Sequence, residues 1–105
     1  MTRKQIITNL KGVFPPVVTP FNRKGGVDFG LFRENLQRYA GIGLSGIVIA
    51  GSTGEAPYLT EHERLQLIEA ARDLVRPPEL LIASTGLEST MLTISFGLDC
   101  LSGAL

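Results

Sequence analysis

The sequence has few of the residues that build metal centres, disulfides and nucleic-acid surfaces. It contains one cysteine, Cys100, and one histidine, His62, so it provides neither an internal disulfide nor a cluster of metal ligands. Ten basic residues balance ten acidic ones, and this zero net charge does not indicate a nucleic-acid or membrane-surface partner. No apolar run approaches the roughly 20 residues that a membrane span requires. We therefore predict no metal, nucleic acid or membrane among the partners.

The N-terminal residues also lack the features of a targeting segment. MTRKQIITNL has no long apolar core, and it has few of the arginines and serines of a transit peptide. The sequence therefore predicts a cytoplasmic protein, although these features discriminate only weakly against a mitochondrial one. With 105 residues, 44% of them hydrophobic, the chain is long enough for one small domain.

Three short apolar runs recur at nearly equal spacing. They are GVFPPVV, GIVIAG and LLIAS, centred near Val17, Val48 and Leu81, which lie 31 and 33 residues apart. This spacing fits one β-strand and one crossover helix per repeat. Because the runs are apolar almost throughout, they are typical of parallel strands covered on both faces. The sequence therefore predicts an α/β fold with three β-α units.

Helix signals fill the intervals between these runs. Asp28 is a predicted N-cap for the first interval, and Thr60 with Glu63 forms a predicted capping box for the second. A third helix is expected from Ser89, although a glycine and two β-branched residues weaken its pattern. Apolar residues at helical spacing predict the buried positions of the first two helices. These positions are Phe29, Phe32, Leu36, Tyr39, Leu65, Ile68, Ala71 and Val75.

The turn after the second run, GSTGE, has the composition of a ligand-binding loop. Gly51 and Gly54 allow a ligand to approach the backbone, and Ser52 and Thr53 add hydroxyl groups. Turns at the carboxyl ends of parallel strands are where α/β proteins bind ligands. The residues alone leave two interpretations, a cradle for a carboxylate or phosphate and a tight turn without a ligand.

Three common sites are disfavoured at this turn. AGSTGE lacks the third glycine of a dinucleotide-binding motif and the Gly-Lys-Ser/Thr ending of a P-loop. Ser52 does not lie in a nucleophile elbow, because Ala50 stands where the first glycine of that motif is required.

The runs and the turn together resemble a known enzyme family. GVFPPVVTPF, GIVIAGSTGEAPYLTEHER and LLIASTGLEST are similar to the dihydrodipicolinate synthase and N-acetylneuraminate lyase family of pyruvate-dependent class I aldolases. The resemblance runs from about Lys11 to the chain end, and GSTGE followed by LT and ER is its most specific part. It implies a (β/α)8 TIM barrel, usually a homotetramer, without a cofactor. In such a lyase a lysine forms a Schiff base with pyruvate or another 2-oxo acid, and a tyrosine shuttles a proton.

The resemblance also implies a role for the turn. By it, Ser52 and Thr53 hold the carboxylate of the 2-oxo acid through backbone N–H groups and hydroxyls, Ser52 joins a proton relay, and Glu55 braces the turn. A fixed carboxylate places the neighbouring ketone for attack by the lysine. At position 52 this chain has serine, whereas many dihydrodipicolinate synthases have threonine. This difference favours the sialic acid lyase, 4-hydroxy-2-oxoglutarate aldolase or sugar-acid aldolase branches of the family.

The lysine and the tyrosine of this chemistry are missing from the sequence. The three lysines, Lys4, Lys11 and Lys24, all precede the first predicted helix, and none lies on a predicted strand. Lys24 follows the first strand, but a solvated loop would not desolvate it as a Schiff-base lysine requires. Structural or surface positions are expected for Tyr39, Tyr58, His62 and Cys100.

Two functions therefore remain open. LDCLSGAL ends where the family's third helix turns toward the fourth strand, so residues 1–105 are expected to be a truncated, N-terminal part of a TIM-barrel aldolase domain. Three parallel strands cannot close a barrel. The chain is either part of a Schiff-base aldolase whose activity needs a longer product, or a non-catalytic fragment that binds a carboxylate or interacts with the full-length barrel.

Overall fold

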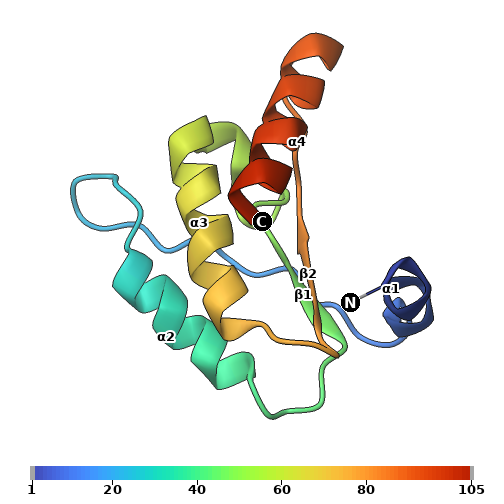
Figure 1. Ribbon diagram of the computed structural model, residues 1–105. Coiled ribbons are helices and arrows are strands. Elements are labelled where there is room, and N and C mark those ends of the chain that lie inside the picture. Colours follow the sequence, from blue (N-terminus) through green and yellow to red (C-terminus); the bar gives the residue numbers. More distant parts are fainter. Residues whose placement is uncertain (1, 105) are drawn as a thin grey trace.

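The computed structural model describes residues 2–104, in which helices cover part of a pair of parallel strands (Figure 1). In chain order the elements are α1 (Arg3–Asn9), α2 (Phe29–Tyr39), β1 (Gly46–Ile49), the short 3-10 helix η1 (Ala56–Tyr58), α3 (Glu61–Leu74), β2 (Leu80–Ala83) and α4 (Thr90–Ala104). β1 pairs with β2 so that Gly46 lies opposite Leu80 and Ile49 lies opposite Ala83. The predicted α/β class is confirmed.

The first predicted strand, near Val17, is only partly formed. This segment lies along the edge of β1 opposite β2, where Pro16 makes an isolated parallel bridge to Val48. Val17 N–H donates to the Val48 carbonyl over 2.8 Å, and Val48 N–H donates to the Pro15 carbonyl over 3.0 Å. Proline has no backbone N–H, so Pro15 cannot donate to β1 and continue the ladder. Within residues 2–104 two of the three predicted strands are confirmed, the first is reduced to an isolated bridge, and three complete β-α units are not confirmed.

Side-chain caps determine where three of the helices begin. Asp28 accepts a hydrogen bond from a backbone N–H in the first turn of α2 over 2.9 Å. Thr60 and Glu63 cap each other's backbone N–H groups at the start of α3, over 3.0 and 2.9 Å. Ser89 accepts a backbone N–H from the first turn of α4 over 3.2 Å. All three predicted helices are confirmed, because capping is a local property of the sequence.

The sequence pattern does not predict α1, since its residues have no apolar periodicity and none of them is buried. The one sequence feature that indicates this helix is a capping box between Thr2 and Gln5 at its start. The helix contacts the rest of the chain where the Asn9 side-chain amide donates to the Pro78 carbonyl over 3.3 Å.

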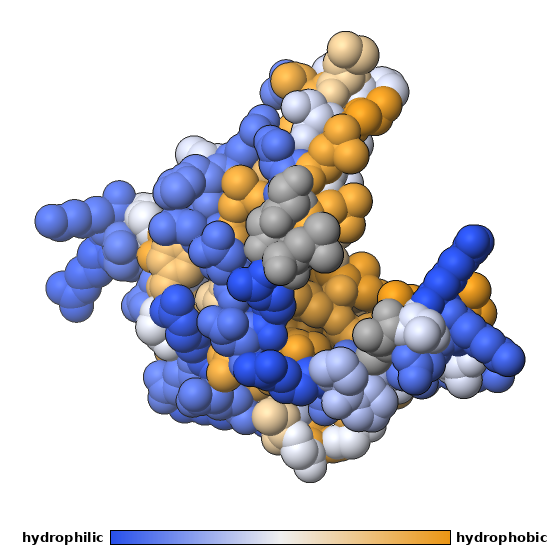
Figure 2. All heavy atoms as spheres, in the orientation of Figure 1, coloured by the Kyte–Doolittle hydropathy of each residue, from blue (hydrophilic) through white to orange (hydrophobic). Residues whose placement is uncertain are grey.

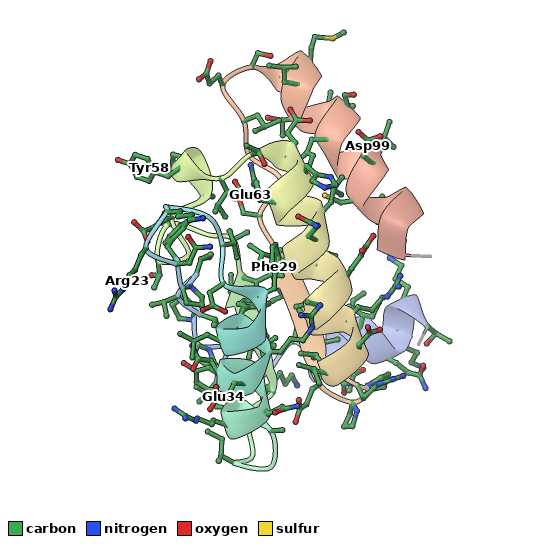
Figure 3. All side chains as sticks on the ribbon, turned by 90° about the vertical axis from the view of Figure 1, so that its left-hand side faces the viewer. Arg23, Phe29, Glu34, Tyr58, Glu63 and Asp99 are labelled. Atoms are coloured by element: carbon green, nitrogen blue, oxygen red, sulfur yellow. The ribbon has the colours of Figure 1, made fainter. Side chains whose placement is uncertain are left out.

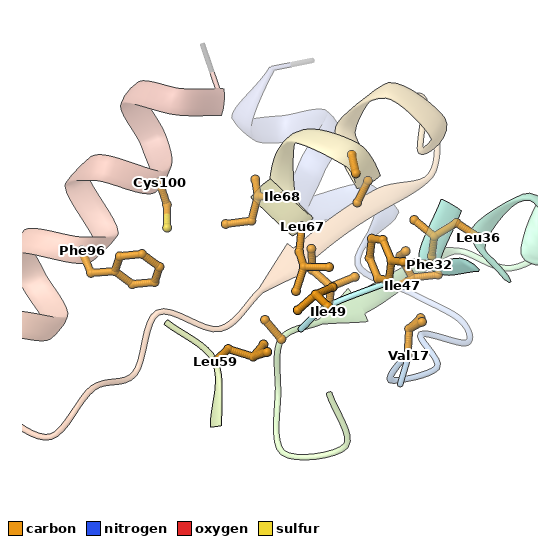
Figure 4. Packing of buried hydrophobic residues seen from close by; sticks show 14 residues of the cluster. Val17, Phe32, Leu36, Ile47, Ile49, Leu59, Leu67, Ile68, Phe96 and Cys100 are labelled. Atoms are coloured by element: carbon orange, nitrogen blue, oxygen red, sulfur yellow. The ribbon is translucent and has the colours of Figure 1, made fainter. Parts of the chain in front are cut away.

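The core lies between the strands and α3, which packs against α2, α4 and β2 (Figure 4). Its members from the strands and from α3 include Ile47, Ile49 and Leu67. From α4, Phe96 and Cys100 are buried in this cluster. Of the predicted buried positions, Phe32, Leu36, Ile68 and Ala71 are buried, whereas Phe29, Tyr39, Leu65 and Val75 are half-buried.

Apolar side chains are exposed over α4 and the strands, in a hollow between α4 and α1 (Figure 2). A groove of about 460 Å³ lies beside β2. Its lining residues are Ile68, Leu81, Ala83, Thr85, Ile94, Gly97, Leu98, Cys100 and Leu101. In the part of the chain that the structure describes, β2 pairs with β1 on one edge and with no strand on the other. None of the helices described is long and apolar enough to cross a membrane.

Candidate ligand-binding turn

The candidate site is the GSTGE turn, residues 51–55, at the carboxyl end of β1. Ala50 and Glu55, which flank its centre, have left-handed backbone angles, with φ of 50° and 60°. The Glu55 N–H donates to the Ser52 carbonyl over 3.1 Å and closes the loop. Ser52 and Thr53 are exposed at its tip. Left-handed non-glycine residues are uncommon and concentrate at ligand-binding segments, so the backbone supports a functional interpretation of this turn.

Two buried contacts hold the base of the turn. Thr19, which is 4% exposed, donates its hydroxyl to the Gly54 carbonyl over 2.7 Å. A Cβ atom on Gly54 would lie 3.0 Å from the Ala50 nitrogen and 3.2 Å from the Val17 carbonyl oxygen, so a side chain does not fit there without a backbone shift. Thr19 was not among the predicted site residues. In the sequence Thr19 stands out only as a polar residue directly after the apolar run VV. Its partner, Gly54, is 35 residues away, so no local pattern links the two.

The tip of the turn offers unpaired hydrogen-bonding groups. Among residues 2–104, the backbone N–H groups and hydroxyls of Ser52 and Thr53 have no hydrogen-bond partner. Adjacent free N–H groups at a turn suit a small anion, and hydroxyl groups can add further donors. The structure therefore places the two predicted binding residues together, in a form that is compatible with a carboxylate.

Glu55 supports this turn through its backbone. Its carbonyl accepts the Tyr58 N–H over 2.9 Å, which joins the turn to η1. In the described part of the chain its carboxylate is exposed and makes no hydrogen bond, so the expected bracing does not come from the side chain.

A cleft of about 690 Å³ opens beside the turn, and Ser52 lines it. η1 and the start of α3 form one wall, and the loop after β2, residues 84–88, contributes to the other. Two exposed carboxylates, Glu61 and Glu88, lie on these walls, and the buried Arg64 lies on the α3 side. The parallel pairing of β1 with β2 explains why both loops border one cleft, since both leave the same end of the sheet.

Arg64 is the least expected residue of this region. It is 1% exposed, and it donates hydrogen bonds to the Ser84 carbonyl over 2.6 Å and to the Gly86 carbonyl over 3.0 Å. Its Cζ atom lies 4.7 Å from the centroid of the Phe96 ring, a cation-π distance. Its buried Nε has no hydrogen-bond partner within residues 2–104. Burial lowers the pKa of the guanidinium, but arginine stays charged at neutral pH.

No lysine lies at this cleft within the described residues. Lys4 is on α1, and Lys11 and Lys24 are in loops. All three are exposed. The structure therefore places none of them on a strand or beside Ser52.

The remaining candidates occupy structural or surface positions. Tyr58 lies in η1, is 79% exposed and points away from the body of the protein (Figure 3). Tyr39 is half-buried against the core, His62 is exposed and Cys100 is buried, as predicted. No group of three or more His, Cys, Asp or Glu side chains that could hold a metal is present in residues 2–104.

Comparison with known proteins establishes the family. A sequence model of the Dihydrodipicolinate synthetase family matches residues 9–99. The chain is 40% identical over 87 residues to a 4-hydroxy-tetrahydrodipicolinate synthase of Methanococcus vannielii, a match that covers 83% of this chain and 30% of that protein. The chain belongs to the Dihydrodipicolinate synthetase family. It spans about 30% of the length of the curated relatives that it matches.

Solved structures agree with this family and with its fold. The crystal structure of a dihydrodipicolinate synthase from Agrobacterium tumefaciens matches with a TM-score of 0.84 and 31% identity, covering 93% of this chain and 33% of that chain. A dihydrodipicolinate synthase from Acinetobacter baumannii, solved in complex with pyruvate, matches with a TM-score of 0.83 and 29% identity, covering 90% and 32%. The described α/β elements thus correspond to a part of a TIM-barrel enzyme.

We predict that Cys100 reacts slowly with iodoacetamide at neutral pH in the folded chain. Burial raises the pKa of its thiol above the ordinary value, although the nearby Arg64 charge opposes this, and only the thiolate reacts. The alkylation rate should be lower than in the urea-unfolded chain and should rise with pH through the alkaline range. The measurement is intact mass against time at several pH values. Equal rates in the folded and unfolded chain would contradict the prediction.

Proposed function

We propose that this chain provides the carboxylate-binding turn of a class I aldolase that acts on pyruvate or another 2-oxo acid. The proposal rests on the adjacent backbone N–H groups of Ser52 and Thr53, which have no hydrogen-bond partner and are exposed. The buried Thr19 hydroxyl fixes the base of their turn through a hydrogen bond to the Gly54 carbonyl. Family membership and the pyruvate complex of one relative support a 2-oxo acid as the anion. The turn lies after a parallel strand, where α/β enzymes bind substrates.

The chemistry of the proposed site begins with positioning. N–H groups and hydroxyls at the tip of the turn would hold the carboxylate and so orient the adjacent ketone toward a nucleophile. The Ser52 hydroxyl both donates and accepts hydrogen bonds, so it can also pass a proton. A lysine that forms a Schiff base with the ketone would supply the electron sink for making or breaking a carbon–carbon bond.

The described lysines do not provide that nucleophile, because all three are exposed and none lines the cleft beside Ser52. We infer that lyase activity requires a catalytic lysine and a tyrosine brought to the turn by further parts of a TIM barrel, assembled as a homotetramer as the family resemblance implies. The 105 residues by themselves are then inactive. The identity of residue 52 favours a sialic acid lyase, a 4-hydroxy-2-oxoglutarate aldolase or a sugar-acid aldolase.

We predict that pyruvate binds weakly to the isolated chain and perturbs the backbone amide resonances of Ser52 and Thr53. Thr53→Ala should raise the dissociation constant about fivefold, because one hydrogen bond contributes about 1 kcal/mol. The measurement is titration followed by amide NMR. Thr8→Ala, on the exposed helix α1, is the matched control and should bind as the original chain does. Absence of pyruvate-dependent shifts in the original chain would overturn the proposal.

A second prediction concerns the nucleophile. Treatment of the chain with pyruvate and borohydride should leave its intact mass at 11.3 kDa, because exposed lysines do not accumulate a Schiff base. A full-length synthase from Methanococcus vannielii treated in the same way is the positive control. A reduced pyruvyl adduct on the 105-residue chain would show that it supplies its own lysine, contrary to the inference above.

The second candidate function is a non-catalytic interaction module, and the apolar groove beside β2 favours it. Leu98 lines this groove and is 60% exposed, and the adjacent edge of β2 has no partner strand within residues 2–104. Such a surface could pair with the strands and helices of a longer relative while that relative folds.

We predict that the chain, added during refolding of a full-length relative, lowers the yield of active enzyme. Leu98→Lys should relieve this inhibition, because it places a charge in the groove. Leu31→Lys, which changes a 40% exposed leucine on α2 away from the groove, should inhibit as the original chain does. Recovery of the same activity with and without the chain would argue against an interaction function.

A further inference from the structure

The cleft contains one charged residue that the proposed function does not use. Arg64 belongs to the ER pair after the turn, and it lines the same cleft as Ser52 although it is 1% exposed. Its guanidinium forms no ion pair within residues 2–104; the nearby Glu61 affects its pKa but makes no salt bridge with it. A buried cation without a carboxylate partner has a large desolvation penalty.

Stability alone does not explain an arginine at this position. Replacing a whole buried ion pair by apolar residues of similar volume is often neutral or stabilising, and Arg64 lacks even the attraction of a carboxylate partner. A methionine would fill a similar space between α3 and Phe96 without that penalty and with flexible packing. What arginine provides at this position and methionine does not is therefore directional hydrogen bonding.

The hydrogen bonds of Arg64 reach one segment only. They go to the carbonyls of Ser84 and Gly86, over 2.6 and 3.0 Å, where the chain leaves β2. From the other side, the Leu87 N–H donates to the Thr93 hydroxyl of α4 over 3.0 Å. Charge-assisted hydrogen bonds are short and strong, so this loop is held against α3 at one end and α4 at the other.

The held segment is a wall of the cleft. Ser84, Gly86 and Leu87 all line it, as does Ser52 from the turn after β1. A wall that is already ordered lowers the conformational entropy lost when a ligand binds beside it. The backbone of the loop after β2 and the tip of the turn after β1 thus face a common space, and Arg64 fixes the first of them.

We propose that Arg64 is a positioning residue, which holds the loop after β2 against α3 and thereby maintains the affinity of the neighbouring Ser52 and Thr53 turn for a 2-oxo acid. This inference rests on the proposed function for its effect on binding. The hydrogen bonds from Arg64 to the Ser84 and Gly86 carbonyls are its structural part and can be measured without a ligand.

The test compares Arg64→Met, Arg64→Lys and the original chain at a temperature where all three are folded. In Arg64→Met, the carbonyl ¹³C resonances of Ser84 and Gly86 should move upfield and amide exchange in residues 84–88 should accelerate. The dissociation constant for pyruvate should rise about tenfold, equivalent to one charge-assisted hydrogen bond. Arg64→Lys, which can still donate to one carbonyl, should recover part of the affinity.

Two controls separate positioning from general stability. Leu36→Ala removes a buried side chain of α2, so it should lower the melting temperature without changing the pyruvate affinity of the folded chain. Arg38→Met removes an exposed arginine that pairs with Glu34 and should change neither quantity substantially.

Each result has a definite meaning. If the original chain does not bind pyruvate, the proposed function fails, and the carbonyl shifts and amide exchange still decide whether Arg64 holds the loop. Unchanged shifts and exchange in both Arg64 variants would overturn the structural part. A loosened loop with unchanged pyruvate affinity would overturn the link to binding, as would an equal loss of affinity in Leu36→Ala.

Discussion

The parallel pairing of β1 with β2 is the constraint on which the rest of this structure depends. The strands run in the same direction, so their following loops leave at the same end of the sheet. One loop is the GSTGE turn and the other is the segment held by Arg64. Gly46 allows this pairing, because a Cβ atom there would collide with the Leu80 carbonyl of β2. Close contact between two short strands thus determines the position of both sides of the cleft.

The site combines a fixed base with an open tip. The base is rigid because Thr19 and Gly54 are buried and bonded, whereas Ser52 and Thr53 present free backbone groups at the surface. Main-chain donors are present whatever the side chain is, so serine or threonine at the tip leaves these N–H groups unchanged. Under the proposed function, a carboxylate would then be held mainly by the backbone, and residue 52 could change without loss of the donors.

Local signals in the sequence predicted α2, α3 and α4, and tertiary contacts account for the site residues that were missed. Asp28, Thr60 and Ser89 cap helices through partners a few residues away, so they are recognisable in the chain itself. Thr19 and Arg64 find their partners 35 and about 20 residues away, and no local pattern contains that information. The apolar run GVFPPVV indicated a strand, but Pro15 deprives it of a donor that a full ladder with β1 needs.

The neighbouring Pro16 also makes the two edges of the sheet chemically different. On the outer edge of the first segment, Pro16 has no N–H to offer, whereas the free edge of β2 retains all of its backbone donors. Continuous edge-to-edge growth of a fibril requires two competent edges on each molecule. Within residues 2–104 the outer edge at Pro16 lacks one donor that the free edge of β2 has, so we expect a further strand to add at β2.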